Sequence, residues 1–369
     1  MNRIASRVFM GPALYVQGPG VLGQLGRIAS ELGDRPLVLL DAGIAQRMRP
    51  ALAQIHAGMP RQPPVVEFSG EITLPVLDGL GREAAVHTPD LVIGIGGGKT
   101  LDAAKGMARR LNCDMVSVPT IASTDAPASR GLVIYDAHHR LIAVEQMARN
   151  PACVLVDTAW IARAPAKFLA AGIGDALSKK FEVRACAAAG GFNKHGTPAC
   201  ATALAIADAC YATLRAHGAT AMQGFETGNH GAALEAVVEA CVLMSSLAFE
   251  NGGLSLAHAM VTGLTQTPGV AQRLHGEHVA YGVLLQLALQ GEDDAGMRDL
   301  MAFLRSVGLP VSLGTLGLPD AGGQDLARIA AMNLTSPLIA HSALRLEPAD
   351  VIAAMRRIEA LAEARTGTL

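Results

Sequence analysis

The sequence has 369 residues, half of them apolar, with 30 basic and 32 acidic side chains. This length and apolar content suffice for one large hydrophobic core or, as we expect here, for two cores in two domains. The nearly balanced charge provides no basic surface for nucleic acid or for an anionic membrane, so neither is expected as a partner.

The expected location is the cytoplasm. The N-terminal residues MNRIASRVFMGP lack a long apolar stretch with a small-residue cleavage site, so no signal peptide is expected. The longest apolar helical run, residues 232–249, contains Glu235 and Glu239, which argues against a membrane span. The six cysteines lie singly in apolar segments, a pattern typical of reduced, buried thiols.

The first half of the chain alternates between two kinds of pattern. Short aliphatic runs, mostly separated by helical patterns, occur at residues 37–40, 65–68, 91–95, 115–118, 133–135 and 154–156. This alternation predicts an α/β domain with a mostly parallel sheet and helices on both faces.

From Pro165 onward, Ala, Leu and Met recur with a helical period and are interrupted by Gly and Pro pairs, which predicts an all-α domain. The expected domains are residues 1–163 and 164–369, with a ligand site in the cleft between them.

Asp41 follows the run at residues 37–40. An acidic side chain at a strand end in a nucleotide-binding domain can accept both hydroxyls of an adenosine ribose, and its charge repels a 2′-phosphate. This would favour NAD over NADP. The alternative is that Asp41 caps a helix beginning near Ile44.

Three consecutive glycines, Gly96, Gly97 and Gly98, separate the run at 91–95 from an amphipathic helical pattern. Glycines adopt positive φ and let the backbone approach a bulky anion, and a helix N-terminus attracts negative charge. The spacing matches neither GxGxxG nor a Walker loop. Lys99 adds a cation where the helix dipole disfavours one unless an anion lies beside it. We therefore favour a phosphate site over a simple tight turn.

Residues 118–135, VPTIASTDAPASRGLVIY, are rich in hydroxyl groups. Their hydroxyls could hydrogen-bond a nicotinamide ribose or carboxamide, and Asp125 could hold the hydroxyls of a small polar substrate. The hydroxyl candidates are Thr120, Ser123, Thr124 and Ser129. The same residue types are common in any surface loop, so both interpretations remain open here.

Asp175, His258, His275 and His278 are candidate metal ligands. One carboxylate with two or three imidazoles suits Zn²⁺ or Fe²⁺ and leaves coordination positions open for a substrate oxygen. Each also has a structural explanation: Asp175 as a helix cap, His258 as a hydrogen-bonded core residue, and His275 as a surface residue. Their spacing matches no recognised zinc motif.

Read together, five segments resemble the iron-containing alcohol dehydrogenase superfamily and, more narrowly, its glycerol dehydrogenase branch. These are, in chain order, GIGGGKTLDAAK, VPTIASTDAPAS, AGIGDALSKKFE, LAHAMVTGLT and HGEHVAYG. The resemblance covers nearly the full length and thins after about residue 330. It implies a Rossmann-like NAD domain, a helical metal domain, homo-oligomers, and zinc-dependent oxidation of glycerol at its secondary hydroxyl to dihydroxyacetone.

The resemblance also implies roles for individual residues. Asp175, His258 and His275 match the metal ligands, with Zn²⁺ expected and Fe²⁺ as the second option, and Asp125 matches the glycerol contact. Together these four are the expected catalytic residues. The expected NAD-binding residues are Asp41, Gly96, Gly97, Gly98, Lys99, Thr120, Ser123, Ser129, Gly131 and Tyr135. His278 replaces a residue that is commonly Lys in the branch and is left outside the metal shell.

The sequence departs from the branch after Ser129, where Arg130, Gly131 and Leu132 replace the common Ala-Leu-Ser. The extra guanidinium could favour a negatively charged substrate, so a hydroxycarboxylate dehydrogenase is the main alternative. A lyase resembling dehydroquinate synthase, or a glycerol 1-phosphate dehydrogenase, needs clustered cations. The second half has no lysine after Lys194, which disfavours both. A non-catalytic nucleotide-binding protein is disfavoured because the expected metal site leaves coordination positions open for a substrate. No role is assigned to His341.

Overall fold

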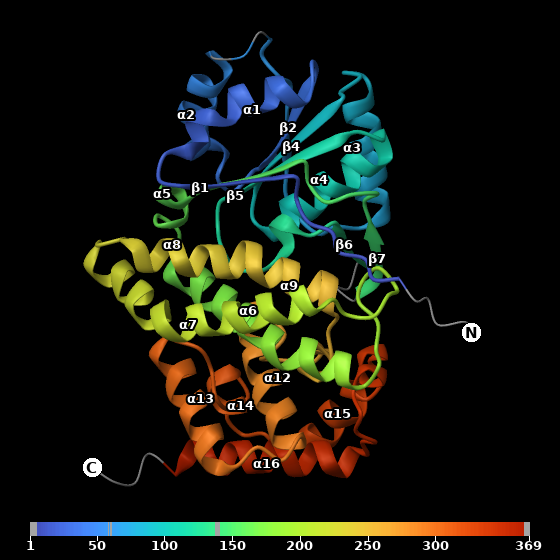
Figure 1. Ribbon diagram of the computed structural model, residues 1–369, viewed down its shortest axis with the longest axis vertical. Coiled ribbons are helices and arrows are strands. Elements are labelled where there is room, and N and C mark those ends of the chain that lie inside the picture. The colour runs from blue at the N-terminus through green and yellow to red at the C-terminus, as the bar shows by residue number, and fades with distance from the viewer. Residues whose placement is uncertain (1–5, 58, 60, 137–140, 365–369) are drawn as a thin grey trace. The chain divides into compact units, whose positions relative to one another are not determined.

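The computed structural model describes residues 6–57, 59, 61–136 and 141–364 and divides into two compact units (Figure 1). The α/β unit is Met10–Pro165, and the helical unit is Ala166–Leu369 together with the residues up to Phe9. The backbone N–H of Val8 donates to Thr197 Oγ1 at 3.2 Å, which explains why this segment groups with the helices rather than with the sheet.

The α/β unit contains a six-stranded sheet in which every recorded strand pair is parallel. Its spatial order is β1 (Leu14–Gly18), β8 (Cys153–Asp157), β5 (Asp114–Pro119), β4 (Leu91–Gly96), β2 (Pro36–Asp41) and β3 (Val65–Phe68). The predicted parallel α/β architecture is confirmed. The run at 133–135 instead belongs to a separate antiparallel hairpin formed by β6 (Gly131–Tyr135) and β7 (Leu141–Gln146).

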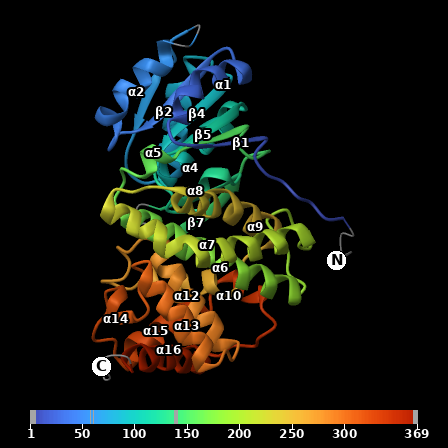
Figure 2. The same ribbon diagram turned by 60° about the vertical axis from the view of Figure 1, so that its left-hand side comes forward.

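Helices cover both faces of the sheet because its central strands are apolar on both sides. In β2, Leu37 and Leu39 pack into a core with α3 (Leu74–Ala85) and α4 (Gly98–Leu111). The alternate residues Val38 and Leu40 share a second core with the opposite pair of helices (Figure 2). That pair is α1 (Leu25–Leu32) and α2 (Ala45–Ala57); the short helices η1 (Val21–Gln24), η2 (Ala126–Ala128) and α5 (Thr158–Ile161) complete the unit.

The order of the strands creates a topological switch point between β2 and β4. The chain leaves β2 through α2 toward β3, whereas it leaves β4 through α4 toward β5, on the other side of the sheet and across its other face. Loops that diverge in this way leave a crevice at the carboxyl ends of the strands, where ligands bind in open α/β sheets. Asp41 and Gly96 end these two strands.

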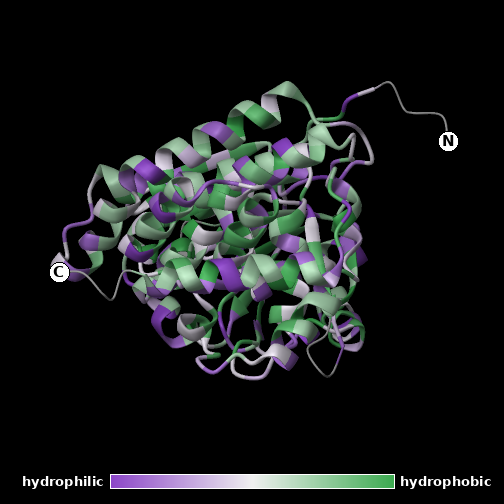
Figure 3. Ribbon diagram, turned by 90° about the horizontal axis from the view of Figure 1, so that it is seen from below, coloured by the Kyte–Doolittle hydropathy of each residue, from purple (hydrophilic) through white to green (hydrophobic). Residues whose placement is uncertain are grey.

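The helical unit has no strand among residues 166–364, as predicted. Its long helices carry apolar residues along much of their length, interrupted by polar residues (Figure 3). In chain order the helices are α6 (Ala166–Ala188), α7 (Ala201–Thr227), α8 (Ala232–Glu239), the π-helical η3 (Ala240–Met244), α9 (Ser245–Gly252), α10 (Leu256–Ala259), α11 (Val261–Leu264), α12 (His275–Leu289), α13 (Asp294–Ser306), α14 (Leu313–Leu316), α15 (Gly323–Asn333), η4 (Pro337–His341) and α16 (Pro348–Glu363).

One helical segment, Ala232–Gly252, is long and apolar enough to cross a membrane by length and composition alone. It runs from α8 through η3 into α9, and half of its apolar window is buried against the rest of the chain. It packs on α6 and α7 and buries the polar residues Ser245, Glu250 and Asn251, as a core helix does. None of the six cysteines forms a disulfide, as predicted, and four of them are buried.

Candidate functional site

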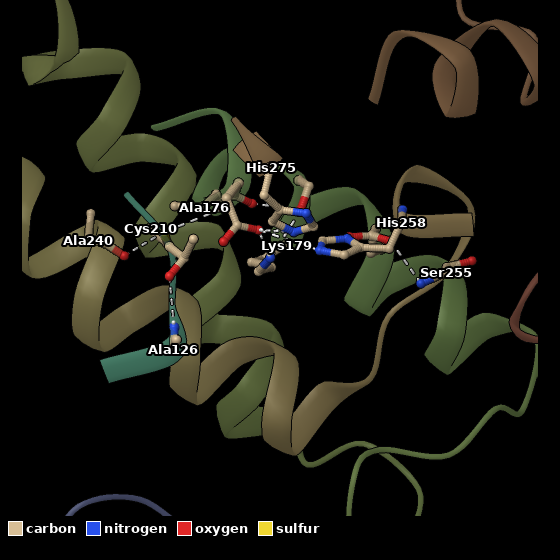
Figure 4. A network of polar contacts seen from close by, with 12 residues as sticks. Ala126, Ala176, Lys179, Cys210, Ala240, Ser255, His258 and His275 are labelled. Carbon is tan, nitrogen blue, oxygen red and sulfur yellow. Dashed lines mark hydrogen bonds and ion pairs between the residues drawn. The ribbon is translucent and has the colours of Figure 1, made fainter. Parts of the chain in front are cut away.

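Three helices of the helical unit bring Asp175, His258 and His275 together. Figure 4 shows the two histidines near each other. Their ligand atoms all lie within 4.8 Å of one another. Asp175 Oδ1 is 3.5 Å from His258 Nε2 and 3.9 Å from His275 Nε2. Atoms that bind one ion at about 2.0–2.2 Å lie roughly 3–4 Å apart, so this set has the chemistry and spacing of a divalent metal site.

Glycines allow the close approach of α6 to the start of α12 that brings Asp175 near His275. A Cβ added at Gly276 would lie 1.7 Å from the carbonyl oxygen of Ala171, and one at Gly174 would lie 2.3 Å from that of Gly276. Any side chain at either position would force the two backbones apart. The separation of these two ligands therefore depends on backbone contact between the helices.

Glu182 orients His258. Its Oε2 lies 2.6 Å from His258 Nδ1, and its Oε1 accepts the backbone N–H groups of Ser255 at 3.0 Å and His258 at 2.9 Å. A carboxylate at Nδ1 places the proton on that nitrogen and leaves the Nε2 lone pair for a metal. Glu182 was not predicted from the sequence as a site residue.

Lys179 was also missed. Its ammonium lies 2.5 Å from Asp175 Oδ1 and 3.4 Å from Ser178 Oγ, and its side chain is fully buried. Asp175, Lys179 and Glu182 follow one another at helical spacings of four and three residues, so they share one face of α6. That pattern of charged residues on a buried helix was a signal available in the sequence.

The two buried carboxylates of the site are held in their ionised form. Burial opposes ionisation of Asp175, but Lys179 and the two imidazoles hold its pKa well below the usual range. Burial also opposes ionisation of Glu182, but the charge and hydrogen bonds of His258 outweigh it and lower the pKa of Glu182 to about 2.

The two imidazoles differ in their protonation. Burial lowers the pKa of His275, an effect that solvent moderates because 43% of its side-chain surface is exposed. At His258 burial is overcome by Glu182 and Asp175, and the pKa is raised. Near pH 7 the site thus offers ionised carboxylates and a neutral His275, whereas His258 has to release a proton when a metal binds.

In the α/β unit, the carboxyl ends of β2, β4 and β5 bring Asp41, Gly96 and Thr120 together. A Cβ at Gly96 would lie 2.8 Å from the Cβ of Asp41 and 2.7 Å from that of Thr100, so only glycine fits there. The Thr120 N–H donates to the carbonyl of Gly96 at 3.0 Å. Asp41 Oδ1 accepts the N–H of Gly43 at 2.8 Å and so also shapes the turn before α2.

Gly97 is the N-cap residue of α4, and no side chain caps this helix. A Cβ at Gly98 would lie 3.3 Å from Thr124 Oγ1, so the loop after β5 lies against the helix start. Uncapped N–H groups at a helix N-terminus suit a phosphate. The expectation of positive φ was wrong for all three glycines of this turn; they are needed for close approach.

Buried Lys105 holds the segment that carries Ser129 and Gly131. Its ammonium donates to the carbonyls of Ala126 at 2.6 Å and Gly131 at 2.7 Å and lies 2.9 Å from Asp102 Oδ1. It also lies 3.4 Å from Ser129 Oγ. These contacts link α4, η2 and the start of β6.

The remaining predicted cofactor and substrate residues lie in the same unit. Lys99 forms an ion pair with Glu71, a residue that the sequence analysis did not consider. Burial, with the charges of Asp102 and Glu71, raises the pKa of Tyr135 to about 12, so its phenol stays protonated. Ser123 and Asp125 are half-buried in the loop before η2. Asp125 therefore belongs to a different unit from the candidate metal ligands.

Three residues that received no definite role from the sequence have a nitrogen near a backbone carbonyl. Buried His278 bonds through Nε2 to Val270 O at 2.9 Å. His341 Nδ1 lies 2.9 Å from the carbonyl of Leu254, just before α10. Arg130 is half-buried and directs Nη1 toward the carbonyl of Met147, 3.5 Å away at the end of the hairpin.

Residues 12–158 match the family model described as iron-containing alcohol dehydrogenase. A glycerol dehydrogenase from Pseudomonas putida is 40% identical over 318 residues, 85% of this chain and 86% of that protein. A glycolaldehyde reductase from Halobacterium salinarum is 37% identical over 350 residues, 95% of each chain. The crystal structure of glycerol dehydrogenase from Schizosaccharomyces pombe matches with a TM-score of 0.92 and 31% identity, covering 100% of this chain and 94% of that one. The chain belongs to the iron-containing alcohol dehydrogenase family.

Proposed function

We propose that this protein is an NAD-dependent polyol dehydrogenase that oxidises glycerol at its secondary hydroxyl to dihydroxyacetone and also accepts related small vicinal diols. The observation that carries the proposal is the convergence of Asp175, His258 and His275 within 4.8 Å. The Pseudomonas putida relative, a glycerol dehydrogenase at 40% identity, supports glycerol as the substrate.

The proposed metal is zinc, with Fe²⁺ as the second option. Three protein ligands with room for a further oxygen are typical of catalytic zinc sites. When bound, such a metal lowers the pKa of an alcohol, and NAD accepts a hydride. Asp175 supplies negative charge, Glu182 keeps the Nε2 atom of His258 available, and the depressed pKa of His275 keeps its imidazole neutral.

For the cofactor we propose NAD bound at the switch point of the sheet. The Asp41 carboxylate accepts hydrogen bonds from the adenosine ribose hydroxyls, and its charge repels a 2′-phosphate. The Gly96-Gly97-Gly98 turn and Lys99 receive the pyrophosphate, which replaces Glu71 as the anion beside Lys99. The remaining contacts, to the nicotinamide ribose and carboxamide, are assigned to Thr120, Ser123, Ser129, Gly131 and Tyr135.

Asp125 is proposed to accept hydrogen bonds from the hydroxyls of the substrate.

A second candidate reaction is the NADH-dependent reduction of glycolaldehyde. It is favoured by the Halobacterium salinarum relative, a glycolaldehyde reductase that aligns over 95% of this chain. Oxidation of a 2-hydroxy acid remains the alternative associated with Arg130, whose guanidinium is directed toward the Met147 carbonyl. All these substrates are small hydroxylated compounds, so turnover rates must distinguish them.

The test is NADH formation or consumption with protein that has been stripped of metal and reloaded with Zn²⁺ or Fe²⁺. The panel contains glycerol, 1,2-propanediol, 2-hydroxybutyrate and, for the reverse reaction, dihydroxyacetone and glycolaldehyde. We expect the highest kcat/KM for oxidation with glycerol and NAD, loss of activity on chelation, and recovery with zinc. Undiminished activity after verified metal removal would refute the metal role; higher kcat/KM with 2-hydroxybutyrate would refute the substrate.

We also propose a cytoplasmic homo-oligomer. Six cysteines without a disulfide suit a reducing compartment, and the helical unit is apolar enough to hide subunit contacts. Analytical ultracentrifugation of the purified protein tests the oligomer; a single species at monomer mass would refute it.

A further inference from the structure

Lys179 is a fully buried lysine next to a metal-ligand candidate. Burying an ammonium is costly unless an anion and hydrogen bonds compensate for lost water. Asp175 supplies the anion at 2.5 Å, and the ring of Phe249 lies 5.7 Å from the ammonium. So costly an arrangement within the candidate metal centre calls for a functional explanation.

The ammonium bonds the same oxygen that faces both imidazoles. Asp175 Oδ1 lies 3.5 Å from His258 Nε2 and 3.9 Å from His275 Nε2. Figure 4 shows Lys179 beside the two histidine rings. The Asp175 carboxylate would therefore contact two cations at once: the ion held by the three ligands, and the ammonium of Lys179.

We propose that Lys179 is a positioning residue that limits the affinity of the centre for its divalent cation. It fixes the carboxylate of Asp175, and it reduces the formal charge of the buried pair Asp175 and Glu182 from two negative charges to one. Repulsion between the ammonium and a dication is poorly screened in a buried site, so the metal binds less tightly than the ligand set alone would allow. This inference rests on the proposed metal centre but not on the identity of the alcohol.

The neighbouring Lys180 provides a matched control. It occupies the next position of α6, is half-buried, and places its ammonium 4.0 Å from the ring of Tyr211. Lys180→Met therefore removes the same charge from the same helix without removing the contact to Asp175.

The experiment measures zinc affinity by competition with a chromophoric chelator, using full-length protein without NAD or substrate. We expect Lys179→Met and Lys179→Gln to bind zinc at least about tenfold more tightly than the wild type, and Lys180→Met to stay within about twofold. A merely structural lysine would have the opposite effect, because its loss would disorder Asp175 and weaken binding. Unchanged or weaker binding in the folded Lys179 variants overturns the proposal.

Stripped Lys179 variants could unfold because Asp175 loses its partner. The second measurement then starts from zinc-loaded protein, checked by circular dichroism, and follows zinc loss into excess chelator. Loss at least about tenfold slower than in the wild type supports the proposal, and equal or faster loss overturns it. A wild type that binds no zinc would refute the metal centre itself, whereas failure to oxidise glycerol would refute only the proposed substrate.

Discussion

Glu182 Oε2 lies 2.6 Å from His258 Nδ1, and the other nitrogen of that ring, Nε2, lies 3.5 Å from Asp175. One buried carboxylate therefore controls the direction and the tautomer of an imidazole that a metal would need. The first prediction concerns Glu182→Gln, which retains the size of the side chain but removes its charge. We expect zinc affinity to fall by about 10–100-fold, as for other residues that orient metal ligands. Chelator competition measures it, with exposed Glu226→Gln as the control; unchanged affinity would contradict this role.

The second prediction concerns pH and metal-free protein. The pKa of Glu182 is about 2 in the folded state, below its ordinary value of 4.5, so unfolded chains bind more protons between these values. The stability from ionised Glu182 is therefore fully present above pH 4.5 and is lost as pH falls toward 2. The difference in unfolding free energy between wild type and Glu182→Gln should shrink as pH falls from about 4.5 toward 2, where the Glu182 carboxylate becomes protonated. Urea unfolding across this range tests it; a constant difference down to pH 3 would contradict the depressed pKa.

The third prediction concerns Asp41→Asn, which keeps an oxygen for the N–H of Gly43 but removes the charge. We expect KM for NAD to rise about tenfold and the preference for NAD over NADP to fall at least about tenfold, because a charged acceptor is lost. Steady-state kinetics with both cofactors measure this, with exposed Asp34→Asn as the control. An unchanged cofactor preference would mean that Asp41 serves only the turn before α2.

The fourth prediction concerns Lys105→Met, which removes the donor to Ala126 and Gly131. We expect the dissociation constant for NADH to rise at least about tenfold as the Ser129 segment loosens, since each lost hydrogen bond to a charged group costs about 1.5–3 kcal/mol. NADH fluorescence measures binding, and exposed Lys167→Met is the control. The double variant with Asp102→Asn should recover stability but not NADH affinity. Recovery of both stability and NADH affinity would show that Lys105 only neutralises the buried charge of Asp102.

The fifth prediction concerns Gly276→Ala. The new Cβ would lie 1.7 Å from the Ala171 carbonyl, so α6 and α12 must separate. We expect a loss of about 3 kcal/mol in unfolding free energy, at the upper end for overpacking, together with a large drop in zinc affinity. Gly323→Ala, where a Cβ meets nothing within 4 Å, is the matched control. Normal zinc affinity in Gly276→Ala would contradict the role of this contact.

The sequence predicted the central strands because they are continuous apolar runs buried on both faces. β1 escaped prediction since LYVQG is a half-buried edge strand with a polar residue and no clear period. β7 escaped because its residues Leu141, Ile142 and Val144 are exposed, so no buried face organises the pattern. Such strands are defined by their partners more than by their own residues.

The candidate site was predictable in part. Asp175, His258 and His275 come from three separate helices, so spacing alone could not associate them, and only the family resemblance did. Lys179 and Glu182 were visible as charges on a buried helix face, but a helix wheel does not tell which of them contacts a distant imidazole. The pair of Lys99 with Glu71 joins the first turn of α4 to the loop after β3 and had no local signal.

The contact between Gly174 and Gly276 has a practical consequence for protein engineering. Because main-chain atoms meet at both glycines, the spacing of the two candidate metal ligands should be less sensitive to changes in the surrounding aliphatic residues than to a side chain at either glycine. A mutant library that keeps both glycines should retain many metal-binding members, whereas one that varies them should retain almost none.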